Sequence, residues 1–221
     1  VRDLFNSRMN TVFKLFFQAW VLLAVGGSYA VHSVWMRGRR AVGVAWSVPV
    51  LVLIGASALY PIQAAYTRTD GFALRAVTLD GLAHWATVYP ADLGAVDWLR
   101  SAGAPGAVLV EAYGGAYEHN GRISMASGVP AVLGWEGHEH QWRGTREQID
   151  PRKADIEALY TTSDDELRRR LLDRYDVRYV VLGDTERGKF GLTADHEERL
   201  RNGLEVAYES PDGRLQVLER R

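Results

Sequence analysis

The sequence has 221 residues, no cysteine and a formal net charge of −1. Without thiols the chain can form no disulfide, no cysteine-ligated zinc site and no thiol nucleophile. The near-zero charge gives no indication of a nucleic-acid partner, and the length allows one or two domains.

Two long apolar runs dominate the first third of the chain. They extend over residues 15–35 and 41–65, and neither contains an acidic residue, a lysine or an arginine. At about 1.5 Å of rise per residue, each run is long enough as a helix to cross the ~30 Å hydrocarbon core of a bilayer. We therefore predict that residues 1–65 form two transmembrane helices in a lipid bilayer.

The first run does not resemble a signal peptide. It is longer than the apolar core of such a peptide, and no small-residue cleavage site separates it from the second run. The chain also begins at Val1, within a polar stretch, rather than at a methionine. We therefore expect residues 1–65 to be the C-terminal end of a longer membrane domain, with upstream membrane helices of the same protein as partners.

The arginines between the two runs indicate an orientation. Arg37, Arg39 and Arg40 lie within four residues, and such clusters favour the cytoplasmic side of a membrane. This orientation predicts a multi-pass protein of the cell membrane whose C-terminal domain is extracytoplasmic. Arg8 and Lys14 then flank the outer end of the first helix, where they could bind a lipid phosphate. The alternative is that Lys14 simply extends to the headgroups.

Residues 66–221 have the composition of a soluble domain, with 20 basic and 26 acidic residues. Apolar spacing predicts one helix over 91–101 and another over 163–175. In the second helix Ser163 is expected as the N-cap, and Glu166, three residues later, completes a capping box.

Strand signals alternate with these helices. Short apolar runs predict buried strands over 107–112 and 177–184, and a turn at Pro211-Asp212-Gly213 predicts a C-terminal hairpin. Alternating helices and strands indicate an α/β fold, here with a mixed sheet that carries an antiparallel pair at one edge. The predicted architecture is two N-terminal transmembrane helices followed by a small extracytoplasmic α/β domain.

The segment 122–144, RISMASGVPAVLGWEGHEHQWRG, has no clear helical or strand period and is predicted to be an irregular loop. His138 and His140 flank Glu139, and on a strand both imidazoles would face the same side, as a metal site requires. The sequence lacks the helical His-Glu-x-x-His zinc motif, so we assign no metal ligand and no cofactor, although a divalent metal is possible. Alternatively, the histidines hold the loop by hydrogen bonds or contact a substrate.

Several charged residues are candidates for ligand binding. Glu111 ends a predicted strand, where α/β proteins place their sites, and could act as a general base or cap a backbone N–H. Arg122 and Arg143 could bind an anion bidentately or form surface salt bridges. Trp135 and Trp142 are expected in the core or at the membrane interface. No catalytic residue is assigned, and the predicted substrate-binding residues are Arg8, Lys14, Glu111, Arg122, His138, Glu139 and Arg143.

A series of motifs in chain order resembles one family. These motifs are RMNTVFKLFFQAW at 8–20, TLDG at 78–81, EAYGGAY at 111–117, the segment 122–144, and DIEALYTT and YVVLGDTER after it. Together they are similar to the YYY family of very hydrophobic, multi-spanning membrane proteins of bacteria and archaea. The resemblance covers nearly the whole chain and implies that it is the C-terminal part of such a protein.

The plan of membrane helices followed by an extracytoplasmic α/β domain also resembles, more loosely, the C-type glycosyltransferases. That resemblance implies a polyprenyl-phosphate sugar as donor and catalytic acids in an outer loop that lies upstream of this sequence. Oligosaccharyltransferases of this type carry a Trp-Trp-Asp motif, whereas this chain has EAYGGAY at the comparable place. The leading hypothesis is therefore a glycosyltransferase-like membrane protein. The alternatives are a non-catalytic, membrane-anchored binding or assembly domain, and metal-dependent hydrolysis at His138 and His140.

Overall fold

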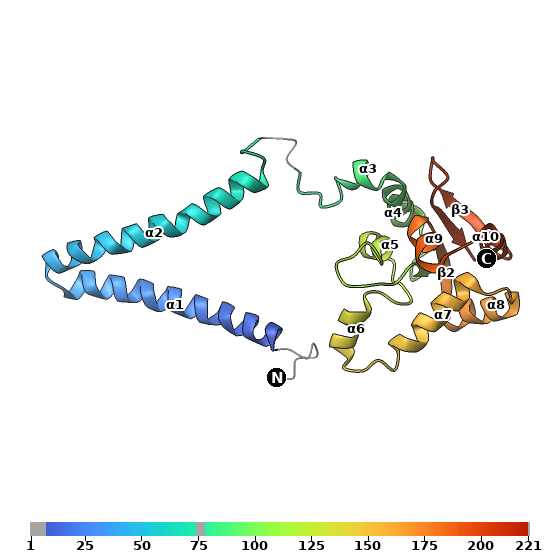
Figure 1. Cartoon of the computed structure of the whole chain (residues 1–221), viewed down its shortest axis with the longest axis horizontal. Helices are drawn as coiled ribbons and strands as arrows, with labels where there is room; N and C mark the ends of the chain where they lie inside the picture. The colour runs from blue at the N-terminus through green and yellow to red at the C-terminus, as the bar shows by residue number, and fades with distance from the viewer. Residues whose placement is uncertain (1–7, 74–77, 221) are drawn as a thin grey trace. The chain divides into compact units, whose positions relative to one another are not determined.

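The computed structural model describes residues 8–73 and 78–220, and the chain divides into two compact units, Val1–Thr78 and Leu79–Arg221 (Figure 1). The helices and strands in chain order are α1 Met9–Arg37, α2 Arg40–Arg68, α3 Trp85–Val88, α4 Pro90–Ala102, β1 Val108–Val110, α5 Arg122–Ser127, α6 Glu136–Arg143, α7 Ile149–Thr161, α8 Asp165–Arg174, β2 Val177–Leu182, α9 Asp184–Phe190, α10 Ala194–Arg201, β3 Glu205–Glu209 and β4 Gln216–Glu219.

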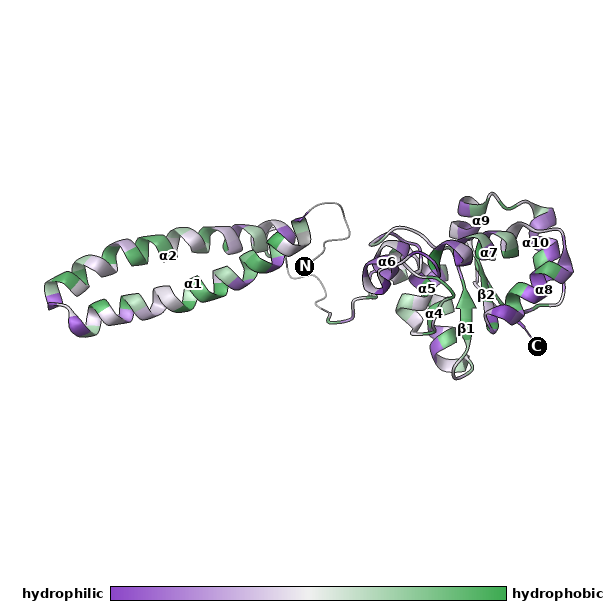
Figure 2. Ribbon diagram, turned by 90° about the horizontal axis from the view of Figure 1, so that it is seen from below, coloured by the Kyte–Doolittle hydropathy of each residue, from purple (hydrophilic) through white to green (hydrophobic). Residues whose placement is uncertain are grey.

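The first unit is a pair of long helices, α1 and α2, of 29 residues each. Both are apolar along most of their length, with hydrophilic residues at the turn between them (Figure 2). Large apolar side chains are exposed along both helices, so the pair does not form the buried core of a soluble domain. By length and composition, each helix can cross a membrane.

A contact near the arginine turn joins the two helices. The indole Nε1 of Trp35 donates a hydrogen bond to Ser47 Oγ at 2.8 Å, and Ser47 donates in turn to the carbonyl of Gly43 at 2.9 Å. The Trp35 ring packs over Gly43, which has no side chain to obstruct it. Small residues and interhelical hydrogen bonds hold helices together in lipid. Lipid tails are themselves apolar, so apolar side chains gain nothing by exchanging lipid contacts for contacts with another helix.

The second unit contains a four-stranded sheet in the order β1-β2-β4-β3. β1 pairs in parallel with β2, with Leu109 opposite Tyr179, and the two other pairs are antiparallel. These pairings confirm the predicted α/β fold with a mixed sheet and an antiparallel hairpin at one edge. The helix predicted over 91–101 is α4, which extends over Pro90–Ala102 and has Gly103 as its C-cap.

Helices cover both faces of the sheet. In β2, Tyr179 and Val181 belong to the apolar cluster formed with α4 and α5. Val180 and Leu182 point to the other face and belong to the cluster formed with α7, α8 and α10. Because both faces are buried, the sequence of β2 is a nearly continuous apolar run rather than an alternating pattern.

The start of α8 differs from the prediction by one residue. Ser163 is not the N-cap. Asp164 takes that position, and its Oδ1 accepts hydrogen bonds from the N–H groups of Glu166 at 2.9 Å and Leu167 at 3.1 Å. A carboxylate satisfies two unpaired donors at once and also complements the positive end of the helix dipole.

We expect Asp164→Ala to lower the free energy of unfolding of the domain by about 1 kcal/mol, because two amide groups lose their acceptor. Ser163→Ala is the matched control and should change that free energy by less than about 0.5 kcal/mol. Urea unfolding of the two variants measures the difference. Equal losses in both would contradict the assignment of Asp164 as the cap.

The segment 122–144 is not the irregular loop that was predicted, because it contains α5 and α6. Gly121 and Gly128 flank α5 with φ angles of 75° and 82°, and Gly144 ends α6 with a φ of 74°. Glycine adopts this left-handed backbone without strain and therefore ends helices well. Two helices of six and eight residues are too short to establish an apolar period, which is why the pattern missed them.

Candidate functional site

A pocket of about 280 Å³ lies at the carboxyl ends of the two parallel strands, the place where open α/β sheets bind ligands. Its buried floor combines residues of α4 and α5, and its walls come from the start of α4, the start of α9 and the turn between β3 and β4. The polar residues that line it are Tyr89, Asp92, His119, Arg122, Asp184, Thr185, Asp212 and Arg214.

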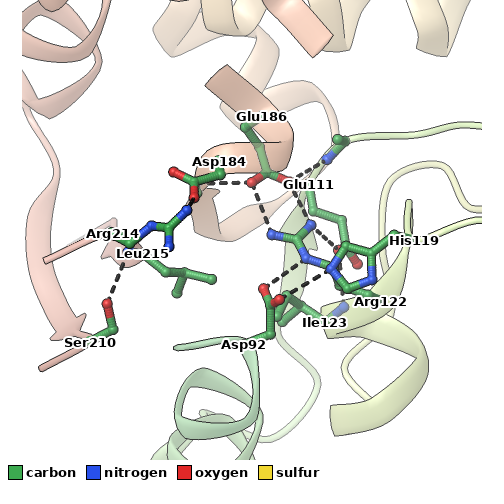
Figure 3. A network of polar contacts seen from close by, with 12 residues as sticks. Asp92, Glu111, His119, Arg122, Ile123, Asp184, Glu186, Ser210, Arg214 and Leu215 are labelled. Atoms are coloured by element: carbon green, nitrogen blue, oxygen red, sulfur yellow. Dashed lines mark hydrogen bonds and ion pairs between the residues drawn. The ribbon is translucent and has the colours of Figure 1, made fainter. Parts of the chain in front are cut away.

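Arg122, the first residue of α5, lies at the floor and is 2% exposed. Its Nε donates to Asp92 at 2.8 Å, and Nη1 and Nη2 donate to the two oxygens of Glu186 at 2.9 and 3.2 Å (Figure 3). Glu111 lies 3.6 Å from Nη1. Burial by itself lowers the pKa of Arg122, but the surrounding carboxylates outweigh burial and raise this pKa, so the guanidinium stays charged.

Glu186 in α9 fastens the ends of the parallel strands to each other. Its Oε1 accepts a hydrogen bond from the N–H of Ala112, just beyond β1, at 3.0 Å. Its Oε2 accepts one from the N–H of Gly183, just beyond β2, at 2.9 Å. With the two bonds from Arg122, each carboxylate oxygen has two donors, which offsets the cost of burying the charge.

Glu111 caps α5 from the end of β1. Its Oε2 accepts from the N–H of Ile123 at 3.0 Å, and its Oε1 accepts from the N–H of Ser124 at 2.7 Å. Burial, together with the nearby charge of Glu186, raises the pKa of Glu111 to about 7, against the opposing effects of Arg122 and the two N–H groups. Of the two roles predicted for Glu111, the structure therefore shows the cap of backbone N–H groups. Each carboxylate oxygen accepts a hydrogen bond from one of these N–H groups.

One wall of the pocket is a stacked aromatic pair. The rings of Tyr89 and His119 are nearly parallel, with their centroids 4.2 Å apart, and Trp85 packs behind them. His119 Nε2 lies 3.1 Å from Asp92 Oδ2. Asp92 therefore links this wall to Arg122, so that the orientation of the imidazole is coupled to the buried ion pairs.

The opposite side of the pocket carries charges that are already paired. Asp184 forms ion pairs with Arg187 and Arg214, and Asp212 accepts a hydrogen bond from the hydroxyl of Ser210 at 2.6 Å. Three aspartates and two arginines line the pocket, and both arginines contact carboxylates. This balance suits a neutral or cationic polar ligand better than an anion.

The structure brings the predicted binding residues of the second unit together in two places. Glu111 and Arg122 meet at the buried floor of the pocket. His138, Glu139 and Arg143 lie on α6, where Glu139 accepts a hydrogen bond from Arg143 Nε at 3.3 Å and one from the backbone. The two groups belong to different elements, α6 lying outside the pocket lining.

The two predicted residues of the first unit, Arg8 and Lys14, are exposed. Arg8 immediately precedes α1, and Lys14 lies in its second turn. Both side chains are therefore accessible to the surroundings of α1.

The two histidines considered for a metal site lie on a helix instead of a strand. His138 and His140 are two residues apart in α6, about 200° around the helix axis, so their imidazoles point to opposite sides. Among the residues that the structure describes, no group of three His, Asp or Glu side chains is placed to hold a metal ion.

Sequence reasoning did not select Asp92, His119 or Glu186 as binding residues, although these three complete the surroundings of Arg122. The rule that selected Glu111, an acid directly beyond a buried strand, would have selected Asp184 after β2, which lines the pocket, but not Glu186, which lies two residues further along in α9. Asp92 is an acid in the first turn of a helix, a common position that by itself does not indicate a site. His119 had no distinguishing pattern in the sequence.

No protein-family model matches the chain, and no curated protein matches it. Among solved structures, the chain is similar to the C-terminal globular domain of an oligosaccharyltransferase from Archaeoglobus fulgidus, with 14% sequence identity and a TM-score of 0.34. That similarity covers 58% of this chain and 96% of the other. The resemblance to the YYY family therefore stays a prediction from the sequence motifs.

Proposed function

We propose that this chain is the C-terminal part of a membrane glycosyltransferase-like protein that transfers a sugar from a polyprenyl-phosphate donor on the extracytoplasmic side. In this proposal α1 and α2 cross the bilayer, and the α/β domain binds a polar acceptor in the pocket. The observation that carries the proposal is the combination, in one chain, of two helices able to cross a membrane with a strand-end pocket of polar side chains.

The chemistry of the pocket favours a neutral, hydroxyl-rich acceptor such as a glycan. Asp184 and Thr185 offer hydrogen-bonding groups, and the stacked rings of Tyr89 and His119 offer an apolar wall. Small-ligand sites typically combine apolar surface with a few polar groups that fix orientation. A volume of about 280 Å³ is at the lower end for such sites, so the pocket fits one end of a larger glycan.

The donor is assigned to the other unit. Arg8 and Lys14 are exposed at the end of α1 opposite the arginine turn, and the phosphate of a polyprenyl lipid would lie at that level of the bilayer. The catalytic acids are expected upstream, as in the glycosyltransferases that the chain resembles. Here the domain contributes binding and orientation of the acceptor, not acid–base chemistry.

Replacing Arg8 and Lys14 together with alanine tests the donor site. In lipid nanodiscs, with a short-chain polyprenyl phosphate as the probe, we expect binding to weaken by about 30-fold, because each basic residue near the headgroups contributes ~1 kcal/mol. The matched control is Arg37→Ala with Arg39→Ala, which removes the same charge at the opposite end of α1 and should leave the affinity unchanged. Equal affinity of both double variants and the wild type would contradict the proposal.

A second candidate is a binding or assembly domain without a part in sugar transfer. The burial of Glu111 and Arg122 favours it. Both side chains bond to other groups inside the domain and are not presented to a substrate. The binding measurement on the Arg8 and Lys14 double variant separates the two candidates. If the domain serves only in assembly, polyprenyl-phosphate binding should not depend on Arg8 and Lys14.

A further inference from the structure

The most exposed aromatic side chains of the second unit gather around α6. Tyr117 is 83% exposed and Trp142 is 82% exposed. Tyr117, Trp135 and His138 form a triangle in which the ring centroids are 5.2 to 5.3 Å apart. We refer to Tyr117, Trp135, His138 and Trp142 as the aromatic surface.

The backbone places these four rings on one side of the domain. Trp135 directly precedes α6, and the spacing of Trp135, His138 and Trp142 follows the i, i+3, i+7 rule for one helix face. On this face Trp142 is exposed and Trp135 and His138 are half-buried, so the face is accessible to the surroundings. The surface is also preorganised in the folded domain, because Trp135 Nε1 donates a hydrogen bond to the carbonyl of Asn120 at 2.9 Å.

The linker to the membrane helices limits how far the domain can lie from lipid. α2 ends at Arg68 and the second unit begins at Leu79, so residues 69–78 join them. Ten residues span at most about 36 Å when fully extended. The domain therefore stays close to the lipid that α2 enters, and tryptophan and tyrosine are the side chains that favour the headgroup layer.

The inclination of the rings favours lipid over a sugar at this surface. The rings of Tyr117 and Trp135 are inclined to that of His138 by 88° and 50°, so the three do not share a flat face on which a sugar ring could stack.

We propose that the aromatic surface rests in the headgroup layer of the membrane that α1 and α2 cross. This contact holds α6 against the bilayer. It is independent of sugar transfer, and it applies equally if the domain serves only in binding or assembly.

The absence of cysteine from the sequence permits a direct test, because one introduced thiol can be labelled uniquely. Bimane is attached to Arg143→Cys, beside the aromatic surface, in nanodiscs that contain brominated phosphatidylcholine. The control is Glu198→Cys, at an exposed residue of α10, a helix that lies apart from α6 in the domain (Figure 1). We expect brominated lipid to remove most of the fluorescence at position 143 and to leave that at position 198 unchanged.

A second variant tests whether the aromatic residues cause the contact. Trp142→Ser with Tyr117→Ser should restore the fluorescence at position 143, and thermal unfolding should be unchanged because both side chains are exposed. Equal fluorescence at positions 143 and 198 in brominated lipid would overturn the proposal. So would an absence of quenching at 143 combined with a shift of its emission on addition of a soluble oligosaccharide, since carbohydrate would then be the partner.

Discussion

Arg122→Leu is expected to lower the free energy of unfolding of the α/β domain by about 3 to 5 kcal/mol, because it leaves the buried carboxylates around Arg122 without a cation. Glu186 loses two charge-assisted hydrogen bonds, and Asp92 loses one. Folded domains are stable by only ~5–15 kcal/mol, so this loss is a large part of the total. Urea unfolding followed by the fluorescence of the domain's tryptophans measures it.

Two controls separate burial of charge from loss of an arginine in general. Arg143→Leu removes an exposed arginine from the same segment and should change the free energy of unfolding by less than about 0.5 kcal/mol. Arg122→Leu with Glu186→Leu removes both partners of the bidentate pair and should be less destabilised than the sum of the two single variants. Strict additivity of the single variants would refute the idea that the pair acts as a unit.

The stability of the domain is expected to fall as the pH rises from about 4.5 to 7. Burial raises the pKa of Glu111 from 4.5 to about 7 in the folded state. Below pH 4.5 the carboxyl is protonated in both states, and its contribution is complete. Between these values only the folded state holds the proton, so the free energy of unfolding decreases by ~1.4 kcal/mol per pH unit, in total about 3 kcal/mol. Above pH 7 the contribution is lost.

Glu111→Gln isolates this effect from the other groups that titrate. The amide cannot ionise, so the free energy of unfolding should change less steeply between pH 4.5 and 7. The difference in this free energy between the two proteins should follow the titration of Glu111. The variant is also expected to be less stable at low pH, because an amide has one oxygen where Glu111 uses two to accept from Ile123 and Ser124. Parallel curves for the two proteins would show that Glu111 does not titrate in this range.

The elements that could be predicted are those whose pattern is local. The apolar runs indicated α1 and α2, and the turn Pro211-Asp212-Gly213 indicated the hairpin. The short helices α5 and α6 were missed because their ends depend on glycines with positive φ, and one or two turns give no period. The glycines after each were the available signal.

The site was predictable only in part because its partners come from distant segments. Glu111 and Arg122 were selected individually, yet the bidentate partner of Arg122 is Glu186, 64 residues later in the chain. Arg168 shows the same limit: it lies on a helix that reads as amphipathic, but it is 2% exposed and donates to the carbonyls of Leu159 and Arg199. Backbone carbonyls of other elements leave no trace in the local sequence.

The clamp that Glu186 forms between the strand ends determines when the domain can be completed during synthesis. Glu186 accepts a hydrogen bond from the N–H of Ala112, which lies 74 residues earlier in the chain. Contacts between such distant residues form slowly, because the entropy of loop closure is lost before the contacts stabilise the fold. During synthesis α1 and α2 are therefore complete long before the sheet can close. A chain halted before β2 lacks the strand that covers the apolar faces of α4 and β1, so incomplete products expose apolar surface.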